Sequence, residues 1–205
     1  MDPAFLISAF ATLFVVIDPI GLTPLFIALT PGASEAHRRA VAFRACLIAL
    51  LVLTLFTFLG EAVLGFIGIS MPAFRISGGI LLFLTALDML FERRTQRRKG
   101  TADEDSSPDP SVFPIAIPLI AGPGAIASMI LLAGQTSDLV GTFAVLGVLL
   151  VVLGCVILLF LAAGIVERAL GKTGIVVITR LLGMLLAALS VQFVIDGLRD
   201  VGALG

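Results

Sequence analysis

Two motifs rich in proline and glycine interrupt apolar stretches of the chain, about a hundred residues apart. The first is Asp18-Pro19-Ile20-Gly21-Leu22-Thr23-Pro24, and the second is Pro118-Leu119-Ile120-Ala121-Gly122-Pro123-Gly124. Proline removes a backbone donor and clashes with the carbonyl four residues earlier, while glycine loosens the backbone, so each motif predicts a broken helix. Unpaired backbone groups are costly in hydrocarbon, so such breaks persist only inside protein or beside a wet cavity. One break in each half of the chain therefore predicts a central binding site.

Asp18 is the strongest single candidate for chemistry. An ionisable group near the bilayer centre costs about 2.5–3.5 kcal/mol on insertion scales and usually serves a function. Its carboxylate could attract a substrate ammonium, a sodium ion or a proton. Aspartate before proline is also a common start signal of a helix, so a capping role stands beside the functional one. The matching position in the second motif is Gly122, which makes the predicted site asymmetric.

Half-helices that restart near Gly21 and Gly124 would present free backbone amides, which favour an anionic group such as a carboxylate. Together with Asp18 they would suit a zwitterion. Thr23 and Ser128 could add hydroxyl contacts, although small residues there also favour close helix packing. The residues predicted to bind substrate are Asp18, Pro19, Gly21, Thr23, Pro24, Gly122, Pro123, Gly124 and Ser128.

The composition places these motifs in a membrane protein. The chain has 205 residues, of which 59% are hydrophobic and 13% charged, and its mean hydropathy is +1.17. These values exclude an ordinary soluble domain and make nucleic acid an unexpected partner. Apolar stretches that could span a core of about 30 Å run over 5–29, 40–60, 71–91, 113–133, 141–165 and 175–198. We therefore expect an all-α integral membrane protein with six transmembrane helices, the first and fourth of them broken.

An internal repeat relates the two halves. Sliding the chain by about 104–106 positions aligns residues that are rare or costly inside spans: Pro19 with Pro123, Glu61 with Glu167, Arg75 with Arg180, Gly78 with Gly183, and Thr85 with Ser190. Three spans per repeat make the second copy enter from the opposite face, which is the inverted 3+3 architecture of many secondary transporters. The predicted organisation is a first repeat at 1–91, a charged flexible cytoplasmic linker at 92–112, and a second repeat at 113–205.

Basic residues alternate between the loops. Arg38 and Arg39, the five basic residues of 93–99, and the pair in the 166–174 loop all fall on one side, against Arg199 alone on the other. By the positive-inside rule both termini lie on the non-cytoplasmic side.

Four further charges recur at matched positions. Arg75 and Arg180 each open a span, where a positive side chain opposes the helix dipole and needs compensation. Glu61 and Glu167 precede them at matched positions, so we expect two equivalent salt bridges that act as structural braces or as gates. Gln192 and Asp196, near the end of the last span, could line an exit path or simply lie at the interface.

Other chemistries lack their motifs. The single histidine, His37, sits beside two arginines in a polar loop and is expected to be solvated. The sequence has no zinc-binding pattern, no phosphate-binding glycine loop and no nucleophile–base set. We therefore expect neither an enzyme nor a protein that binds ATP, and no cofactor or firm metal site beyond a coupling ion, sodium or a proton, near Asp18.

The two break motifs, with Leu29-Thr30 after the first, Ala125-Ile126 after the second and Arg75-Ile76-x-Gly78-Gly79 in the third span, resemble the MarC family over essentially the whole chain. This family is similar to small bacterial inner-membrane transporters related to the LysE exporters, and is also called the neutral amino acid transporter family. The resemblance implies transport of small neutral amino acids such as glycine or alanine across the inner membrane. The acidic segment 101–109 looks like an addition peculiar to this sequence.

The predicted function is secondary transport of such amino acids, coupled to sodium or protons, through a midplane site at the two breaks. The direct partners would be the lipid bilayer and the substrate, and a homo-oligomer stays open. The alternatives are a transporter of another small solute, a non-transporting membrane scaffold, a channel, and an intramembrane enzyme.

Overall fold

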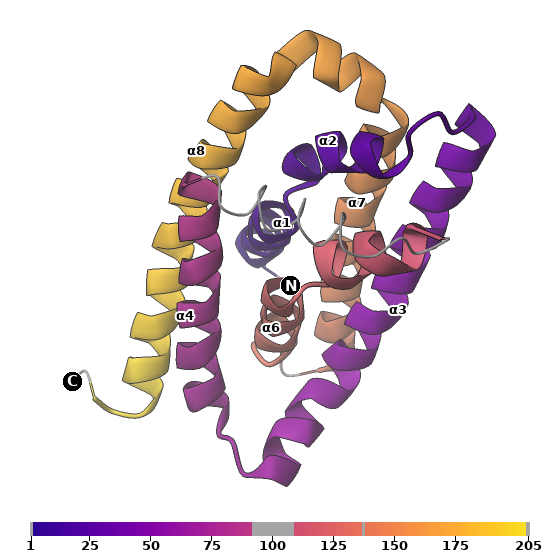
Figure 1. Ribbon diagram of the computed structural model, residues 1–205. Helices are drawn as coiled ribbons and strands as arrows, with labels where there is room; N and C mark the ends of the chain where they lie inside the picture. Colours follow the sequence, from indigo (N-terminus) through magenta and orange to yellow (C-terminus); the bar gives the residue numbers. More distant parts are fainter. Residues whose placement is uncertain (1, 92–108, 137, 204–205) are drawn as a thin grey trace.

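The computed structural model describes residues 2–91, 109–136 and 138–203, which form helices joined by short turns (Figure 1). Five helical stretches are long and apolar enough to cross a membrane: Pro3–Leu29, Glu35–Ile67, Met71–Leu90, Leu139–Leu161 and Thr173–Asp200. Two shorter segments, Ser111–Ile120 and Pro123–Ala133, are bent by 55° at their junction and together make up a sixth candidate span. No strand occurs in the described residues. The all-α membrane architecture is confirmed, while most of the predicted linker lies outside the described residues.

The first span consists of two helices, α1 (Pro3–Ile17) and α2 (Pro19–Leu29), separated by the single residue Asp18. Asp18 adopts a left-handed backbone conformation, with φ 56° and ψ 64°, which ends α1. Pro19 then starts α2, because its fixed φ and missing N–H suit the first position of a helix. In Figure 1, α1 is seen nearly end-on and α2 runs across the view.

The second broken span consists of η1 (Ser111–Ile120) and α6 (Pro123–Ala133). Within η1, Phe113 and Ile117 have extended backbone angles, and each precedes a proline. Proline disfavours the helical conformation of the residue before it, so this segment is irregular along its length. The expected breaks in the first and fourth spans are both present.

α3 (Glu35–Ile67) and α4 (Met71–Leu90) complete the first half of the chain. The α3 helix continues past Gly60, where the expected second span ends, and stops at Gly68 with φ 85°. At 33 residues it is about 50 Å long. Gly60 is a packing residue, since a Cβ added there would lie 2.5 Å from Ile130 Cγ1 of α6. Close contact between α3 and α6 explains the glycine.

α7 (Leu139–Leu161) and α8 (Ala163–Asp200) complete the second half. Most of the expected 166–174 loop is helical, and the chain changes direction at Gly171, which has φ 61° and is the non-helical residue within α8. This kink is visible in Figure 1, where the first part of α8 crosses the top of the molecule before the helix descends.

The broken helices lie inside the molecule, with α3, α4, α7 and α8 around them (Figure 1). The Phe26 ring of α2 stacks on the Phe160 ring of α7, with centroids 4.3 Å apart. α4 packs most extensively against α8. The glycine contacts between these two helices run in opposite order along the chain: Gly79 with Val194, Gly183 with Met89, and Gly197 with Ile76. The two helices are therefore antiparallel.

The element order is the same in both halves: a broken helix, a long helix and a third helix. The antiparallel packing of the two third helices, α4 and α8, is what an inverted repeat would produce. The division of the chain at 1–91 and 113–205 stays a prediction that this geometry favours.

Candidate functional site

Asp18 caps the helix that follows it. Its side chain is 1% exposed, and its Oδ1 accepts a hydrogen bond of 3.1 Å from the Gly21 backbone N–H. A Cβ added to Gly21 would lie 2.1 Å from Asp18 Oδ2, so only glycine leaves room for this cap. The capping role is thus present. The expectation that the Gly21 amide would be free for a substrate carboxylate is wrong, because the protein's own carboxylate occupies it.

The N-terminus of α6 is arranged differently. Its N-cap residue is Gly122, and no side chain caps this end of the helix within the described residues. Pro123 has no N–H, and among the described residues no group accepts a hydrogen bond from the N–H of Gly124 or Ala125. Both residues are buried. Free amides and the positive end of the helix dipole together favour an anion at this position.

The two breaks lie side by side. A Cβ added to Gly124 would lie 3.2 Å from Val16 Cγ1, and Val16 is two residues before Asp18. The same added atom would lie 3.3 Å from Leu82 Cδ2 and 3.8 Å from Thr85 Oγ1, both on α4. The amide end of α6 therefore sits against the end of α1, with the Thr85 hydroxyl beside it.

Ser128 adds an unsatisfied hydroxyl one turn further along α6. It is four residues from Gly124, so both lie on the same face of the helix. The residue is 0% exposed, and its Oγ has no hydrogen-bond partner among the described residues. Buried hydroxyls are nearly always paired, so this one is a candidate for binding a polar ligand. Thr23, its counterpart in α2, is also buried, but its Oγ1 donates to the Pro19 carbonyl at 3.0 Å.

The remaining predicted site residues have structural positions. Pro19 is buried at the start of α2, and Pro24 is half-buried within it. Pro123 is exposed at the start of α6. Gly122 is half-buried, and a Cβ added there would lie 2.6 Å from the Pro118 carbonyl oxygen, so glycine is required for the bend. These residues shape the breaks.

Three neighbours of Gly124 were not expected from the sequence: Val16, Leu82 and Thr85. Only Thr85 had a signal, because it aligns with Ser190 in the internal repeat. The apolar pair carried no signal, since valine and leucine occur throughout the spans.

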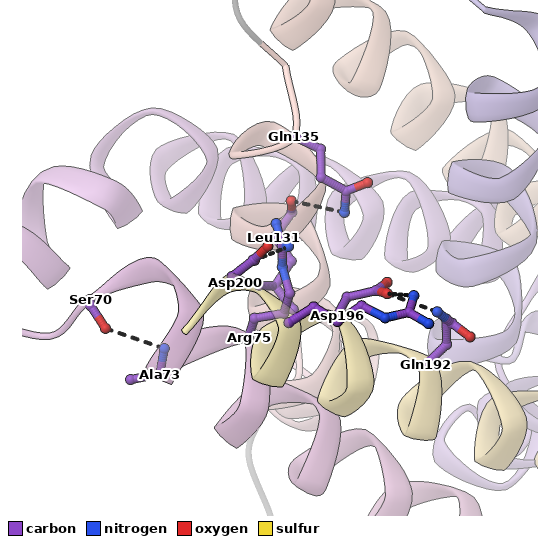
Figure 2. Close-up of polar contacts among 9 residues, drawn as sticks. Ser70, Ala73, Arg75, Leu131, Gln135, Gln192, Asp196 and Asp200 are labelled. Atoms are coloured by element: carbon purple, nitrogen blue, oxygen red, sulfur yellow. Dashed lines mark hydrogen bonds and ion pairs between the residues drawn. The ribbon is translucent and has the colours of Figure 1, made fainter. Parts of the chain in front are cut away.

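The expected salt bridges do not form. Arg75 pairs with Asp200 at 2.5 Å between Nη1 and Oδ2, and not with Glu61 (Figure 2). Asp200 lies within reach of Arg75 because α4 and α8 are antiparallel, which places the end of α8 beside the start of α4. Likewise, within the described part of the chain no ion pair joins Glu167 to Arg180. These two residues lie on opposite sides of the kink at Gly171.

Other polar residues lie near this end of the molecule. Glu61 lines a cavity of about 400 Å³, which also involves Thr57, Asp138 and Thr142. Asp196 accepts a hydrogen bond of 2.8 Å from Gln192 Nε2 (Figure 2). The described residues contain no group of three or more histidine, cysteine, aspartate or glutamate side chains that could hold a metal ion.

Up to six candidate spans, two of them broken at adjacent points, define a polytopic helical membrane protein. Comparison with known sequences identifies the group. The MarC family integral membrane protein model matches residues 4–201. The chain therefore belongs to the MarC family.

Its relatives match over nearly their whole lengths. The chain is 37% identical over 201 residues to a UPF0056 membrane protein of Methanocaldococcus jannaschii, covering 97% of this chain and 98% of that protein. It is 38% identical over 199 residues to one from Archaeoglobus fulgidus, covering 96% and 93%. It is 34% identical over 194 residues to the UPF0056 inner membrane protein YhgN of Escherichia coli K12, covering 95% and 96%. No solved structure matches the chain.

Proposed function

We propose that this protein is a secondary transporter of small neutral amino acids, with glycine and alanine as the model substrates. The observation that carries the proposal is the pairing at the two breaks. The N-terminus of α6, which has no side-chain cap among the described residues and favours a carboxylate, lies beside a break that holds the buried carboxylate of Asp18. A zwitterion carries the two complementary charges.

Each end of the substrate has a candidate partner. The N–H groups of Gly124 and Ala125 and the Ser128 hydroxyl, which lack hydrogen-bond partners among the described residues, would bind the substrate carboxylate. Asp18 would attract the ammonium group while it caps α2. Gly124 contacts Val16, Leu82 and Thr85 closely, so any space for a substrate side chain is small.

The coupling ion in this proposal is sodium or a proton, and the site needs no organic cofactor. The protein would lie in the inner membrane, as the printed name of its Escherichia coli relative says of that protein, with both termini on the non-cytoplasmic side. Neither an enzymatic activity nor a nucleic-acid partner belongs to the proposal. The bilayer and the solute are its direct partners.

Uptake into liposomes tests this function. Purified protein is reconstituted, and entry of labelled glycine is measured under imposed sodium or proton gradients. We expect saturable uptake that excess unlabelled alanine inhibits. Acetate and methylamine, which each carry one of the two charges, should inhibit far less. Absence of saturable uptake in a well-folded preparation would contradict the proposal.

The Ser128→Ala variant tests the site itself. It removes a buried hydroxyl that has no partner among the described residues, so the stability should stay unchanged or rise by about 1–3 kcal/mol. Uptake should nevertheless fall. Ser190→Ala is the matched control, because Ser190 is equally buried but its Oγ donates to the Ala187 carbonyl at 2.7 Å. Equal uptake by Ser128→Ala and wild type would remove Ser128 from the site.

A further inference from the structure

The start of α4 and the end of α8 are joined by a charge pair that neither helix favours by itself. Arg75 lies in the second turn of α4, where the helix dipole is positive, and Asp200 is the last residue of α8, where the dipole is negative. Asp200 is therefore misplaced on its own helix, and Arg75 gains no stabilisation from the dipole of α4. The antiparallel packing brings them together at 2.5 Å, so each charge is compensated only while the two ends stay in contact.

Arg75 lies three residues before Gly78, so it is on the side of α4 that contacts α6. One turn further along α4, Gly78 packs against Leu131 of α6, where an added Cβ would lie 3.1 Å from Leu131 Cδ1. Two and three turns beyond Arg75, Leu82 and Thr85 lie against Gly124 at the break. We define the α4–α6 seam as this line of contacts from Gly78 to Thr85. Figure 2 shows the Arg75–Asp200 pair beside Leu131.

The length of the seam matches half of a membrane. Ten residues separate Arg75 from Thr85, which is about 15 Å along a helix. Half of the hydrocarbon core is also about 15 Å. With the breaks at the bilayer midplane, as the sequence predicts, the charge pair would lie at a membrane face, and the seam would lead from it to the breaks.

The α4–α8 interface is closely packed, with glycines of each helix against the other. A Cβ added to Gly79 would lie 2.8 Å from the Ser190 carbonyl oxygen, and one added to Gly197 would lie 2.6 Å from Ile76 Cγ1. Small residues allow the backbones of the two helices to approach closely. The Arg75–Asp200 pair adds an ionic link between the two helices at this end of the interface.

We propose that the Arg75–Asp200 pair is a gate that closes the α4–α6 seam, and that its opening admits solute to the break site from this face. The role of this gate depends on the proposed transport function. Its opening can be measured without a substrate. The pair Arg199–Asp196, at 3.6 Å, lies within α8 on the same face and joins no second helix, which makes it an internal control.

Cysteine labelling tests the gate. In a background with Cys46→Ala and Cys155→Ala, Ser128→Cys places a thiol on α6 at the inner end of the seam, and its reaction with a charged, water-soluble maleimide is timed in nanodiscs. Arg75→Glu sets two negative charges against each other. Because like charges would shift the equilibrium towards the open form, we expect labelling to be about tenfold faster.

Two comparisons make the result specific. Arg75→Glu combined with Asp200→Arg restores an opposite pair and should return labelling to the parent rate. Arg199→Glu makes the same change of charge on the same face and should leave the rate unchanged. If Arg75→Glu labels at the parent rate, or if Arg199→Glu accelerates labelling equally, the gate is overturned.

Two further variants guard against misfolding and loss of specificity. Asp200→Asn changes a half-exposed residue and removes the attraction without adding repulsion, so it carries the test if Arg75→Glu does not fold. Thr23→Cys places the thiol on α2, outside the α4–α6 seam. Its labelling should not accelerate with Arg75→Glu, and equal acceleration at both positions would indicate general loosening and overturn the gate. Because labelling needs no transport, failure of the gate and failure of the transport function are separate results.

Discussion

Replacing Asp18 by three neutral residues separates its capping role from its charge. The Asp18→Asn, Asp18→Gly and Asp18→Ala variants all lack the carboxylate charge, so differences in stability among them report only the cap and the backbone. Asparagine can accept the hydrogen bond from the Gly21 N–H and tolerates the left-handed conformation with φ 56°. Glycine loses the acceptor but adopts the conformation without strain.

The structure sets the size of each effect. Loss of an N-cap costs about 0.5–2 kcal/mol when alanine replaces it, and only a few tenths when glycine does. A left-handed conformation costs alanine about a further 1–2 kcal/mol. Asp18→Ala should therefore be about 1.5–4 kcal/mol less stable than Asp18→Asn. Asp18→Gly should be close to Asp18→Asn.

Thermal unfolding of the purified variants in one detergent measures this order, and glycine uptake measures the role of the charge. We expect Asp18→Asn to fold as well as wild type and to lose most of its uptake. If Asp18→Ala is as stable as Asp18→Asn, the reasoning about the cap and the left-handed backbone is refuted. If Asp18→Asn retains full uptake, the carboxylate does not bind the ammonium group.

Two further predictions concern packing and pH. Gly197→Ala should lower stability by about 1–3 kcal/mol in the same thermal assay, because its Cβ would lie 2.6 Å from Ile76 Cγ1. Gly147→Ala is the control and should be neutral or stabilising, because its Cβ would meet nothing within 4 Å. Hydrogen bonds from Ser111, together with Arg44, hold the pKa of Asp109 below its usual range. These interactions stabilise the folded protein fully above the ordinary carboxyl pKa, and the stabilisation is lost as the pH falls through the lower pKa of Asp109 in the folded protein. Acidification should therefore reduce the difference in Tm between wild type and Asp109→Asn. A difference in Tm that does not depend on pH would contradict this prediction.

The helix breaks could be predicted from the sequence because their causes are local. Proline removes a donor and restricts the residue before it wherever it occurs, so the breaks at Asp18 and Gly122 follow from the motifs themselves. Capping by Asp18 is equally local, since it joins residues three apart in the chain. Glycine was a less reliable signal. Gly60 lies within a continuous helix, because its role is to allow contact with Ile130, which is distant in the chain.

The partners of the charged residues depended on the packing of the helices. Matched spacing favoured Glu61 as the partner of Arg75, but a repeat pattern does not show which helix ends meet. The antiparallel contact between α4 and α8 brings Asp200 to Arg75, 125 residues away. For the same reason Val16, Leu82 and Thr85 could not be assigned to the neighbourhood of Gly124 in advance.

The sequence by itself determined that the chain crosses a membrane, where its helices break and how Asp18 ends one helix and starts the next, because composition and neighbouring residues decide each of these. Only the tertiary structure decided that the two breaks touch, that the first amides of α6 have no acceptor among the described residues, and that the Ser128 hydroxyl likewise lacks a partner there. These features depend on distances between residues far apart in the chain, which hydrophobic patterns do not encode.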